Sequence, residues 1–271
     1  ILIPLRAAGV PIMEGAECAT AALRNLADFH EFRETRRAGD ARVTVMPAPH
    51  SILPSGILPT EAAFRLFQSF GIPVTPTELI GSGDAAAAAA ERMGFPVALK
   101  IESAQITHKS DVGGVALKLA SAAEVRRAYA QIHQHVSARA PGAIIDGVVV
   151  QRMAGQGVEM IIGVKRDPLF GPVVLCGFGG ILVEVLKDAA IGIPPLSEEQ
   201  ARDMIARLRG FSILSGARGK PPADIDSLCD AIVRVSQLAL SVGDQLVGLD
   251  INPLIVQTHG VVAVDALIEI K

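Results

Sequence analysis

The last part of the sequence places three oxygen-bearing side chains where they could bind a cation. Asp250 and Asn252 are two residues apart in an apolar stretch, so in a β-strand they would share one face and lie about 6.6 Å apart. A second apolar stretch, which contains Asp265, follows after residues 257–260. If the two strands pair through a loop of two or four residues, Asn252 lies opposite Asp265, with Cβ atoms about 5 Å apart. A three-residue loop would turn Asp265 to the other face.

Carboxylates inside an apolar hairpin need a partner, because burying an unpaired carboxylate is costly. Mg²⁺ is bound by one or two carboxylates and completes its coordination with phosphate oxygens and water. Asp250, Asn252 and Asp265 therefore form a candidate magnesium site. The alternative is that the two aspartates face solvent at a sheet edge, and the spacing alone does not decide between these interpretations.

A loop with two adjacent glycines is the second candidate site. Residues 108–115 separate two predicted strands, and Gly113 and Gly114 would let the backbone approach a phosphate group with its N–H groups directed at it. The loop is not a P-loop, because no Gly-Lys-Ser/Thr leads into a helix, and ordinary turn formation also explains the paired glycines. His108 could carry charge, donate a hydrogen bond or accept a phosphoryl group. Its alternative is an ordinary role in the loop.

Lys100 is the third candidate. It lies in an otherwise apolar predicted strand, between Leu99 and Ile101. An inward-facing lysine needs an anionic partner, and a nucleotide phosphate would serve. Alternatively the strand exposes one face to water, and Lys100 and Ala98 belong to that face.

Helix signals indicate the elements that would position these residues. We predict Thr60 and Asp84 as helix N-caps and Gly71 as a helix stop. Ser121 and Ser197 each begin a capping-box pattern. The predicted helices are residues 60–70, 84–94, 121–139, 197–209 and 224–242.

Strand signals lie on both sides of the helix 121–139. The predicted strands are residues 96–101, 114–119, 148–150, 158–164, 172–176, 181–186, 246–256 and 261–270. This arrangement predicts a two-lobed α/β fold of the α+β type rather than one parallel sheet with regular crossovers. We expect the main domain to span residues 59–271, with one lobe over about 59–147 and the other over about 148–271.

The first 58 residues do not follow the pattern of the main domain. Residues 1–37 look like the tail of another domain, with a helix from Thr20 to Arg33, and residues 38–58 are rich in proline and glycine and read as a linker. Because the sequence starts with isoleucine, we expect it to be a piece of a longer chain.

Composition excludes several classes of protein. The 271 residues are 50% hydrophobic but only 4% aromatic, which suits an α/β protein packed with alanine, valine and isoleucine better than an aromatic-rich binding module. A net charge of −3 gives no long-range attraction for nucleic acid or anionic lipid. Cys18, Cys176 and Cys229 are isolated and read as reduced thiols. We expect a cytoplasmic protein that binds neither nucleic acid nor a membrane.

An ordered series of motifs resembles the ATP-grasp domain of ADP-forming acyl-CoA synthetases, which are relatives of the succinyl-CoA synthetase β subunit. The resemblance covers about residue 59 to the end of the chain. The motifs are Val97–Ile101, Thr107–Val115, Val158–Val164 with Asp167–Pro172, Gly177–Gly180 with Glu184, and Asp250–Leu254. Residues 1–37 resemble the end of the flavodoxin-like CoA-ligase domain that precedes ATP-grasp in single-chain members.

The resemblance implies a role for each matched position. Lys100 would contact nucleotide phosphate, and the loop with Ser110, Gly113 and Gly114 would cover the phosphates. His108 would relay phosphate into the nucleotide site. The remaining implied contacts are adenine for Val150, Gln151 and Met153, ribose for Glu159, and Mg²⁺ for Asp250, Asn252 and Asp265.

The implied activity is phosphoryl transfer between ATP or ADP and a phosphohistidine, coupled to formation or cleavage of an acyl-CoA. The partners would be CoA-binding and CoA-ligase domains, in the same longer chain or in a partner subunit, together with CoA and a small carboxylic acid. One alternative is a non-catalytic, ligand-sensing domain of a multidomain protein acetyltransferase. Another is an ATP-grasp ligase that uses an acyl phosphate without a phosphohistidine.

Overall fold

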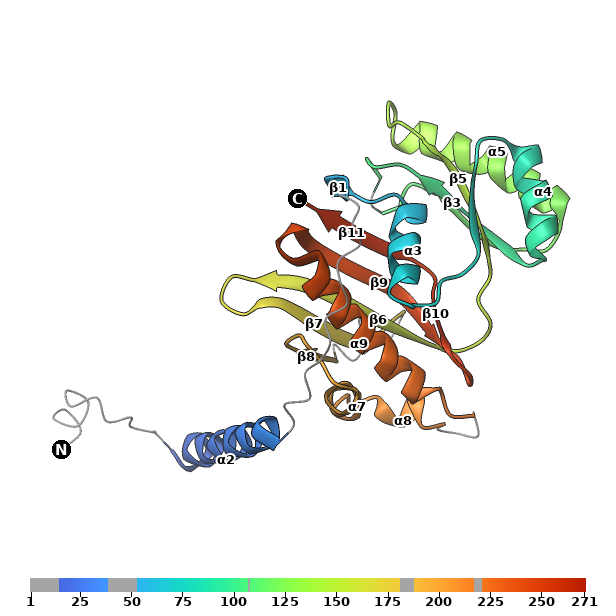
Figure 1. The fold of residues 1–271 in the computed structure, drawn as a ribbon. Helices are drawn as coiled ribbons and strands as arrows, with labels where there is room; N and C mark the ends of the chain where they lie inside the picture. The colour runs from blue at the N-terminus through green and yellow to red at the C-terminus, as the bar shows by residue number, and fades with distance from the viewer. Residues whose placement is uncertain (1–14, 39–52, 107, 181–187, 217–220) are drawn as a thin grey trace. The chain divides into compact units, whose positions relative to one another are not determined.

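The computed structural model describes residues 15–38, 53–106, 108–180, 188–216 and 221–271 (Figure 1). The chain divides into two units, residues 1–44 and residues 45–271. In the first unit the described residues form helix α2 (Ala16–Ala38), which confirms the predicted helix and extends it. Most of the predicted linker, the predicted strand 181–186 and Glu184 lie outside the described residues.

A small antiparallel sheet forms the first layer of the second unit. In the described part of the chain its four strands lie in the order β2-β5-β3-β4. They are β2 (Thr77–Ile80), β3 (Val97–Glu102), β4 (Val115–Leu119) and β5 (Gly147–Arg152). Helices α4 (Gly83–Met93) and α5 (Ala122–Arg139) pack against this sheet (Figure 1).

Alternation along β3 gives the small sheet two different buried faces. Val97, Leu99 and Ile101 belong to the apolar core that α4 and α5 cover. Lys100 and Glu102 point to the opposite face, where they are nevertheless buried. Such buried charged groups require partners from outside the small sheet.

A second antiparallel sheet forms the other layer. Among the described residues it has seven strands, in the order β1-β11-β9-β6-β7-β8, with β10 paired to β9. Its strands are β1 (Gly56–Ile57), β6 (Val158–Asp167), β7 (Gly171–Phe178), β8 (Ala189–Gly192), β9 (Leu246–Val256), β10 (Val261–Ala263) and β11 (Ala266–Ile270). The helical elements in this part are α3 (Thr60–Ser69), α7 (Glu198–Ala206), α8 (Phe211–Leu214), α9 (Ile225–Val242) and the 3₁₀ turn η2 (Gly243–Gln245).

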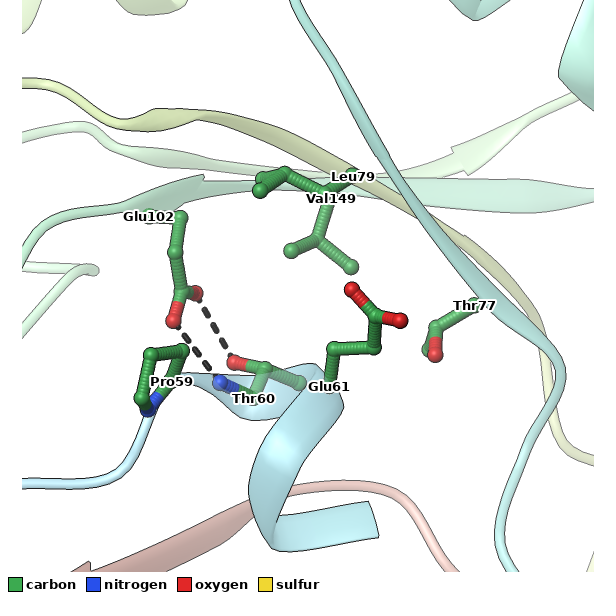
Figure 2. Close-up of a pocket in the computed structure, with 7 residues that line it drawn as sticks. All are labelled: Pro59, Thr60, Glu61, Thr77, Leu79, Glu102 and Val149. Carbon is green, nitrogen blue, oxygen red and sulfur yellow. Dashed lines mark hydrogen bonds between the residues drawn. The ribbon is translucent and has the colours of Figure 1, made fainter. Parts of the chain in front are cut away.

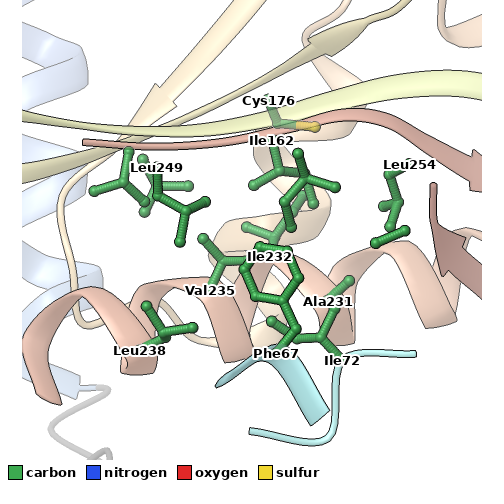
Figure 3. Packing of buried hydrophobic residues seen from close by; sticks show 14 of the residues in the cluster. Phe67, Ile72, Ile162, Cys176, Ala231, Ile232, Val235, Leu238, Leu249 and Leu254 are labelled. Carbon is green, nitrogen blue, oxygen red and sulfur yellow. The ribbon is translucent and has the colours of Figure 1, made fainter. Parts of the chain in front are cut away.

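Helix α9 lies across one face of the large sheet, and Figure 3 shows its apolar side packed against that sheet together with Phe67 of α3. Phe64 of α3 and Phe70, which directly follows α3, also lie in this core. Helix α3 follows β1 and precedes the small sheet in the chain, yet it packs with the large sheet. The two-lobed α+β fold predicted from the sequence is therefore confirmed. Its two layers, however, do not divide the chain at residue 147, because β5 pairs with β2 and β3.

Local rules predicted some helix starts wrongly. Thr60 does not cap α3, because Pro59 is the N-cap and the Thr60 hydroxyl donates to Glu102 instead. Asp84 lies in the first turn of α4, while the Ser82 hydroxyl accepts the N–H of Ala85 and forms the cap. Other signals are confirmed: both capping-box bonds form at Ser197, and the Ser121 hydroxyl accepts the N–H of the fourth residue of its pattern. Asp224 caps α9.

The predicted strand 261–270 is interrupted, since β10 and β11 are separated by Val264 and Asp265. The structure also contains β8, which the sequence pattern did not predict. No helix in the described ranges is long and apolar enough to cross a membrane.

Truncation of Phe67 tests how much the apolar core of the large sheet contributes to the free energy of unfolding. Phe67 is 0% exposed, so Phe67→Ala leaves a cavity between α3 and the sheet and is expected to lower the free energy of unfolding by about 3–5 kcal/mol. Urea unfolding followed by circular dichroism measures the loss. Leu169→Ala is the matched control, because Leu169 is 88% exposed and should be nearly neutral. Equal effects of the two substitutions would contradict the packing.

Candidate functional site

The register of β9 with β11 brings the three predicted cation ligands together. A four-residue loop, 257–260, joins β9 to β10, and the pairs Ala266–Ile251 and Leu267–Asp250 set the register. The backbone N–H of Asn252 donates to the carbonyl of Asp265 at 3.3 Å. The predicted placement of Asn252 opposite Asp265 is therefore confirmed.

Asp250 is an interior residue of the large sheet and not an edge residue, because β9 is paired with β6 on one side and β11 on the other. Burial raises the pKa of the Asp250 carboxyl, a hydrogen bond with Asn252 opposes the rise, and the charge of Asp265 adds to it. Two carboxylates and an amide thus share a small space. The repulsion between the two carboxylates favours occupation of that space by a cation. Within the described ranges no cluster of three His, Cys, Asp or Glu residues could hold a metal, so this set needs further ligands such as phosphate oxygens and water.

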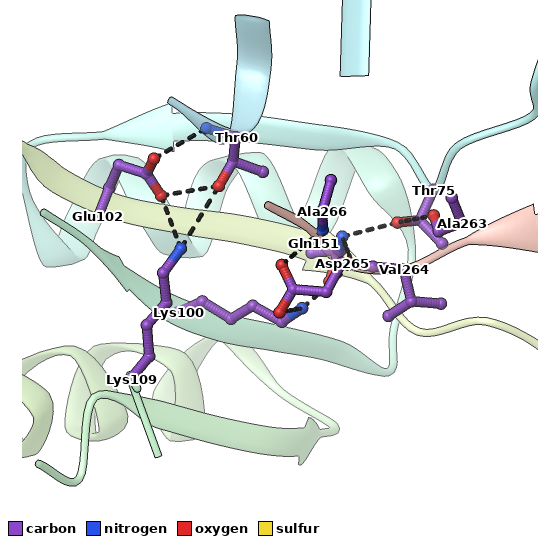
Figure 4. A network of polar contacts seen from close by, with 10 residues as sticks. All are labelled: Thr60, Thr75, Lys100, Glu102, Lys109, Gln151, Ala263, Val264, Asp265 and Ala266. Carbon is purple, nitrogen blue, oxygen red and sulfur yellow. Dashed lines mark hydrogen bonds and ion pairs between the residues drawn. The ribbon is translucent and has the colours of Figure 1, made fainter. Parts of the chain in front are cut away.

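Lys100 faces inward, toward the same residues. Its side chain is 10% exposed, its Nζ donates to the Val264 carbonyl at 3.1 Å, and the same atom lies 3.3 Å from Asp265 Oδ2 (Figure 4). Burial lowers the pKa of the Lys100 ammonium, against the attraction of Asp265. The interpretation of Lys100 as a residue of a solvated face is wrong, and an anionic partner is present in the protein itself.

Gln151 is a second link between the small sheet and residue 264. It is 1% exposed, and its Nε2 donates to the Thr75 hydroxyl at 2.6 Å and to the Val264 carbonyl at 2.9 Å. The Val264 carbonyl therefore accepts from both Lys100 and Gln151. These two hydrogen bonds fix Val264, and they thereby hold the next residue, Asp265, where its carboxylate faces Lys100.

The loop with the paired glycines satisfies its own N–H groups. Gly113 donates to the Ser110 carbonyl at 3.0 Å and Gly114 donates to the Lys109 carbonyl at 2.8 Å. A Cβ on Gly114 would lie 2.5 Å from Ile101 Cγ2, so close packing by itself requires a glycine there. His108 and Ser110 are exposed. For this loop to bind phosphate through the glycine N–H groups, its internal hydrogen bonds would have to open.

The residues matched to adenine and ribose are spread more widely. Val150 is 0% exposed in the apolar core under α4 and α5, on the opposite face of β5 from Gln151. Met153 donates its N–H to the Pro96 carbonyl at 3.1 Å. Glu159 is exposed on β6, and its carboxylate covers Gly180, where a Cβ would clash with it. The structure brings Lys100, Asp250, Asn252 and Asp265 together, but not the Val150 side chain.

A buried cluster that the sequence analysis did not identify lies beside this group. Glu102 Oε1 accepts the N–H of Thr60 at 2.8 Å, and Glu102 Oε2 accepts the Thr60 hydroxyl at 2.8 Å and Lys109 Nζ at 3.0 Å (Figures 2 and 4). Glu102 also lines a pocket of about 40 Å³ with Thr77, Leu79 and Val149 (Figure 2). The one sequence signal for the cluster was a glutamate directly after the predicted strand 96–101.

The Glu102 cluster makes the free energy of unfolding depend on pH. Burial opposes ionisation, yet the charge of Lys109 and the hydrogen bonds from Thr60 hold the pKa of the Glu102 carboxyl below its usual value. A depressed pKa contributes stability above the unfolded-state pKa of about 4.3, and this contribution is lost as pH falls through the lower folded-state value. We expect wild type to exceed Glu102→Gln in unfolding free energy by about 2 kcal/mol at pH 7, and by less at pH 3. Urea unfolding at both pH values measures this, and a pH-independent difference would contradict it.

The family model of the ATP-grasp domain matches residues 54–270. The chain belongs to the ATP-grasp family and, within it, to the nucleotide-binding domains of ADP-forming acyl-CoA synthetases.

Two relatives define the extent of the match. The chain is 40% identical over 211 residues to the β subunit of acetate–CoA ligase (ADP-forming) II of Pyrococcus furiosus, covering 77% of this chain and 89% of the relative. It is 36% identical over 269 residues to a trans-feruloyl-CoA synthase of an unknown prokaryotic organism, covering 98% of this chain and 37% of the relative. The chain thus spans about a third of the length of that synthase.

Solved structures agree with the fold. The dinucleotide-forming acetyl-coenzyme A synthetase 1 of Candidatus Korarchaeum cryptofilum, solved with coenzyme A and Ca-AMPCP, is 41% identical, with a TM-score of 0.77 over 80% of this chain and 94% of that chain. A second structure of it holds coenzyme A and Mg-AMPPCP, with its phosphohistidine segment pointing towards the nucleotide-binding site. The sequence of that structure is 39% identical to this chain, with a TM-score of 0.69 over 79% of this chain and 93% of that chain.

Proposed function

We propose that this chain is the nucleotide-binding part of an ADP-forming acid–CoA ligase, in which it transfers a phosphoryl group between ATP or ADP and a phosphohistidine. The observation that carries the proposal is the convergence of Lys100 from one sheet with Asp265, Asp250 and Asn252 from the other. A buried ammonium beside two carboxylates and an amide provides one group for phosphate oxygens and three for a cation. Carboxylates for Mg²⁺ and a lysine for phosphate oxygens are recurring parts of sites that bind a Mg–nucleotide complex.

The donor set fits Mg²⁺. It has two carboxylates and one amide oxygen, leaving room for phosphate oxygens and water in an octahedral shell. Asp250, Asn252 and Asp265 would hold the ion, which supplies neutralisation of the negative charge on the phosphates. Lys100 would exchange its contact with Asp265 for a nucleotide phosphate oxygen, and Gln151 would keep the Val264 carbonyl in place while it does so.

The phosphoryl step is assigned to His108. In the direction of ATP synthesis, the P–N bond of phosphohistidine breaks, a P–O bond forms to the terminal oxygen of ADP, and the imidazole is regenerated. His108 is exposed on a loop that Lys109 ties to the interior, so it can reach a phosphoryl donor outside the chain. Ser110, Gly113 and Gly114 would cover the phosphates after rearrangement of their internal hydrogen bonds, and Gln151, Met153 and Glu159 stay as the proposed contacts to the nucleoside. Val150 is withdrawn from this set, because its side chain is 0% exposed in the core under α4 and α5.

The partners follow from the reaction that is proposed. We propose that domains binding CoA and a small carboxylic acid act with it, either in the same longer chain or in a partner subunit, and that the assembly works in the cytoplasm. The relative from Pyrococcus furiosus is named as a β subunit, and the feruloyl-CoA synthase is longer than this chain, which supports both arrangements.

Calorimetric titration of the 271-residue chain with ATP and with ADP, each with and without Mg²⁺, tests the proposal. Nucleotide binding that requires Mg²⁺ supports it. The absence of binding by a chain that is folded by circular dichroism contradicts it. Binding without any acid-labile phosphate on His108 would favour the ligand-sensing alternative over the enzyme.

A further inference from the structure

The Glu102 carboxylate joins three segments that are distant in the sequence. It ends β3, it accepts the first N–H of α3 and the hydroxyl of Thr60, and it pairs with Lys109 in the loop that carries His108. The N–H groups in the first turn of a helix have no partner within that helix, so a carboxylate from another element is a strong acceptor for them. Glu102 therefore caps α3 from the small sheet.

This cluster connects the two apolar cores. Helix α3 packs with the large sheet through its phenylalanines, whereas Val97, Leu99 and Ile101 of the strand that Glu102 ends belong to the core under α4 and α5. The side chain of Glu102 is 9% exposed and that of Lys109 is 18% exposed. A charged pair shielded to this extent is screened little by salt and holds its geometry better than a surface pair.

Lys109 is also the point at which the loop is attached. Its carbonyl accepts the N–H of Gly114, its Nζ lies 3.0 Å from Glu102 Oε2, and the same Nζ donates to the Thr60 hydroxyl at 3.4 Å. The neighbouring residues His108 and Ser110 are exposed. The position of the His108 backbone therefore depends on the Lys109 side chain.

We propose that Lys109 and Glu102 are positioning residues that fix the His108 loop against the N-terminus of α3, so that His108 meets the phosphoryl group in line. The proposal rests on the function proposed above for His108. Misplacement of a reacting atom by about 1 Å costs about a hundredfold in rate, so a loop freed from this anchor should transfer phosphate slowly while the nucleotide still binds.

Hydrogen exchange of the 271-residue chain tests the anchor without reference to activity. In Lys109→Met we expect the amides of Gly113 and Gly114 to exchange at least about tenfold faster, while amides in the middle of α5 are unchanged. Lys109→Arg keeps the charge and should restore slow exchange. Glu61→Gln is the matched control, because Glu61 is next to Thr60 but pairs with Arg65 instead of with the loop. Loop amides that exchange at the wild-type rate in Lys109→Met would overturn the proposal.

Labelling of His108 by [γ-³²P]ATP and Mg²⁺ tests the consequence. We expect Lys109→Met and Thr60→Val to lower the labelling rate at least about tenfold, with Mg-ATP affinity within about twofold of wild type. Lys109→Arg should recover the rate, which a merely destabilised protein would not do.

If Lys109→Met does not fold because Glu102 is left without its cation, the double variant Glu102→Gln/Lys109→Met removes both charges and takes its place. Unchanged labelling in a variant whose loop exchanges fast would overturn the positioning role. Absence of label in wild type would contradict the proposed function, while the exchange data would still decide whether the anchor exists.

Discussion

Replacing Asp250 or Asp265 with alanine is expected to abolish Mg²⁺-dependent nucleotide binding. Asp250 and Asp265 are the two carboxylates of the proposed ligand set, whose third member is the neutral amide of Asn252, so each provides a large part of the negative charge that a cation would meet. Loss of an outer partner of a metal ligand costs about 10–100-fold in affinity, and loss of a ligand itself costs more. We therefore expect at least a loss of about a hundredfold in Mg-ATP affinity, measured by calorimetry.

The variant Asp250→Asn distinguishes a cation-binding role of the Asp250 carboxylate from a role in stabilising the fold. It removes one of two neighbouring carboxylates that repel each other, so the protein without metal should melt at the wild-type temperature or about 2–4 °C higher. A carboxylate that only stabilised the fold would give a lower melting temperature. Glu269→Gln, an exposed carboxylate on β11, is the control and should change neither property. Wild-type Mg-ATP affinity in Asp250→Ala or Asp265→Ala would refute the metal assignment.

His108→Ala is expected to stop phosphoryl transfer and to leave nucleotide binding unchanged. The side chain is exposed, so its loss disturbs no packing, and Lys100 and the three candidate metal ligands stay as they are. Removal of a nucleophile eliminates the covalent step, so acid-labile labelling by [γ-³²P]ATP should fall by at least about a thousandfold. Calorimetry should give a Mg-ATP affinity within about twofold of wild type.

His30→Ala is the matched control for His108→Ala, because His30 is also exposed and lies in α2, outside the ATP-grasp match. It should label as wild type does. Wild-type labelling in His108→Ala would show that another residue accepts the phosphate, and the acyl-phosphate mechanism without a phosphohistidine would then be favoured.

Secondary structure and the pairing of the last strands could be predicted from the sequence because both depend on local pattern. Alternating apolar residues define β9, and the length of the 257–260 loop fixes the register that sets Asn252 opposite Asp265. Gly71 ends α3 at a φ of 74°, as the sequence indicated. The order of motifs along the chain likewise identified the family, since each motif is a short segment whose residue types are visible without the fold.

Thr60 shows where local rules fail. A threonine at a helix start is ordinarily an N-cap, but in this protein Glu102 accepts the Thr60 N–H and hydroxyl, although 42 residues separate the two in sequence. The adenine assignment of Val150 shows the same limit. Its position in β5 could be predicted, but the face of β5 that lies under α4 and α5 depends on how the helices pack on the sheet.

The sequence by itself determined most of the strands and helices and the family of this protein, because alternation, capping and turn signals act between near neighbours. It left the β9–β11 register open between loop lengths, and the structure decided that register through the four-residue loop 257–260. Only the tertiary structure decided the partners of the buried polar and charged side chains. Lys100 meets the Val264 carbonyl across 164 residues, and Gln151 meets Thr75 across 76 residues. These contacts exist because two sheets pack with their polar faces toward each other, and no periodicity in the sequence records which buried charge on one sheet lies opposite which carboxylate or carbonyl of the other.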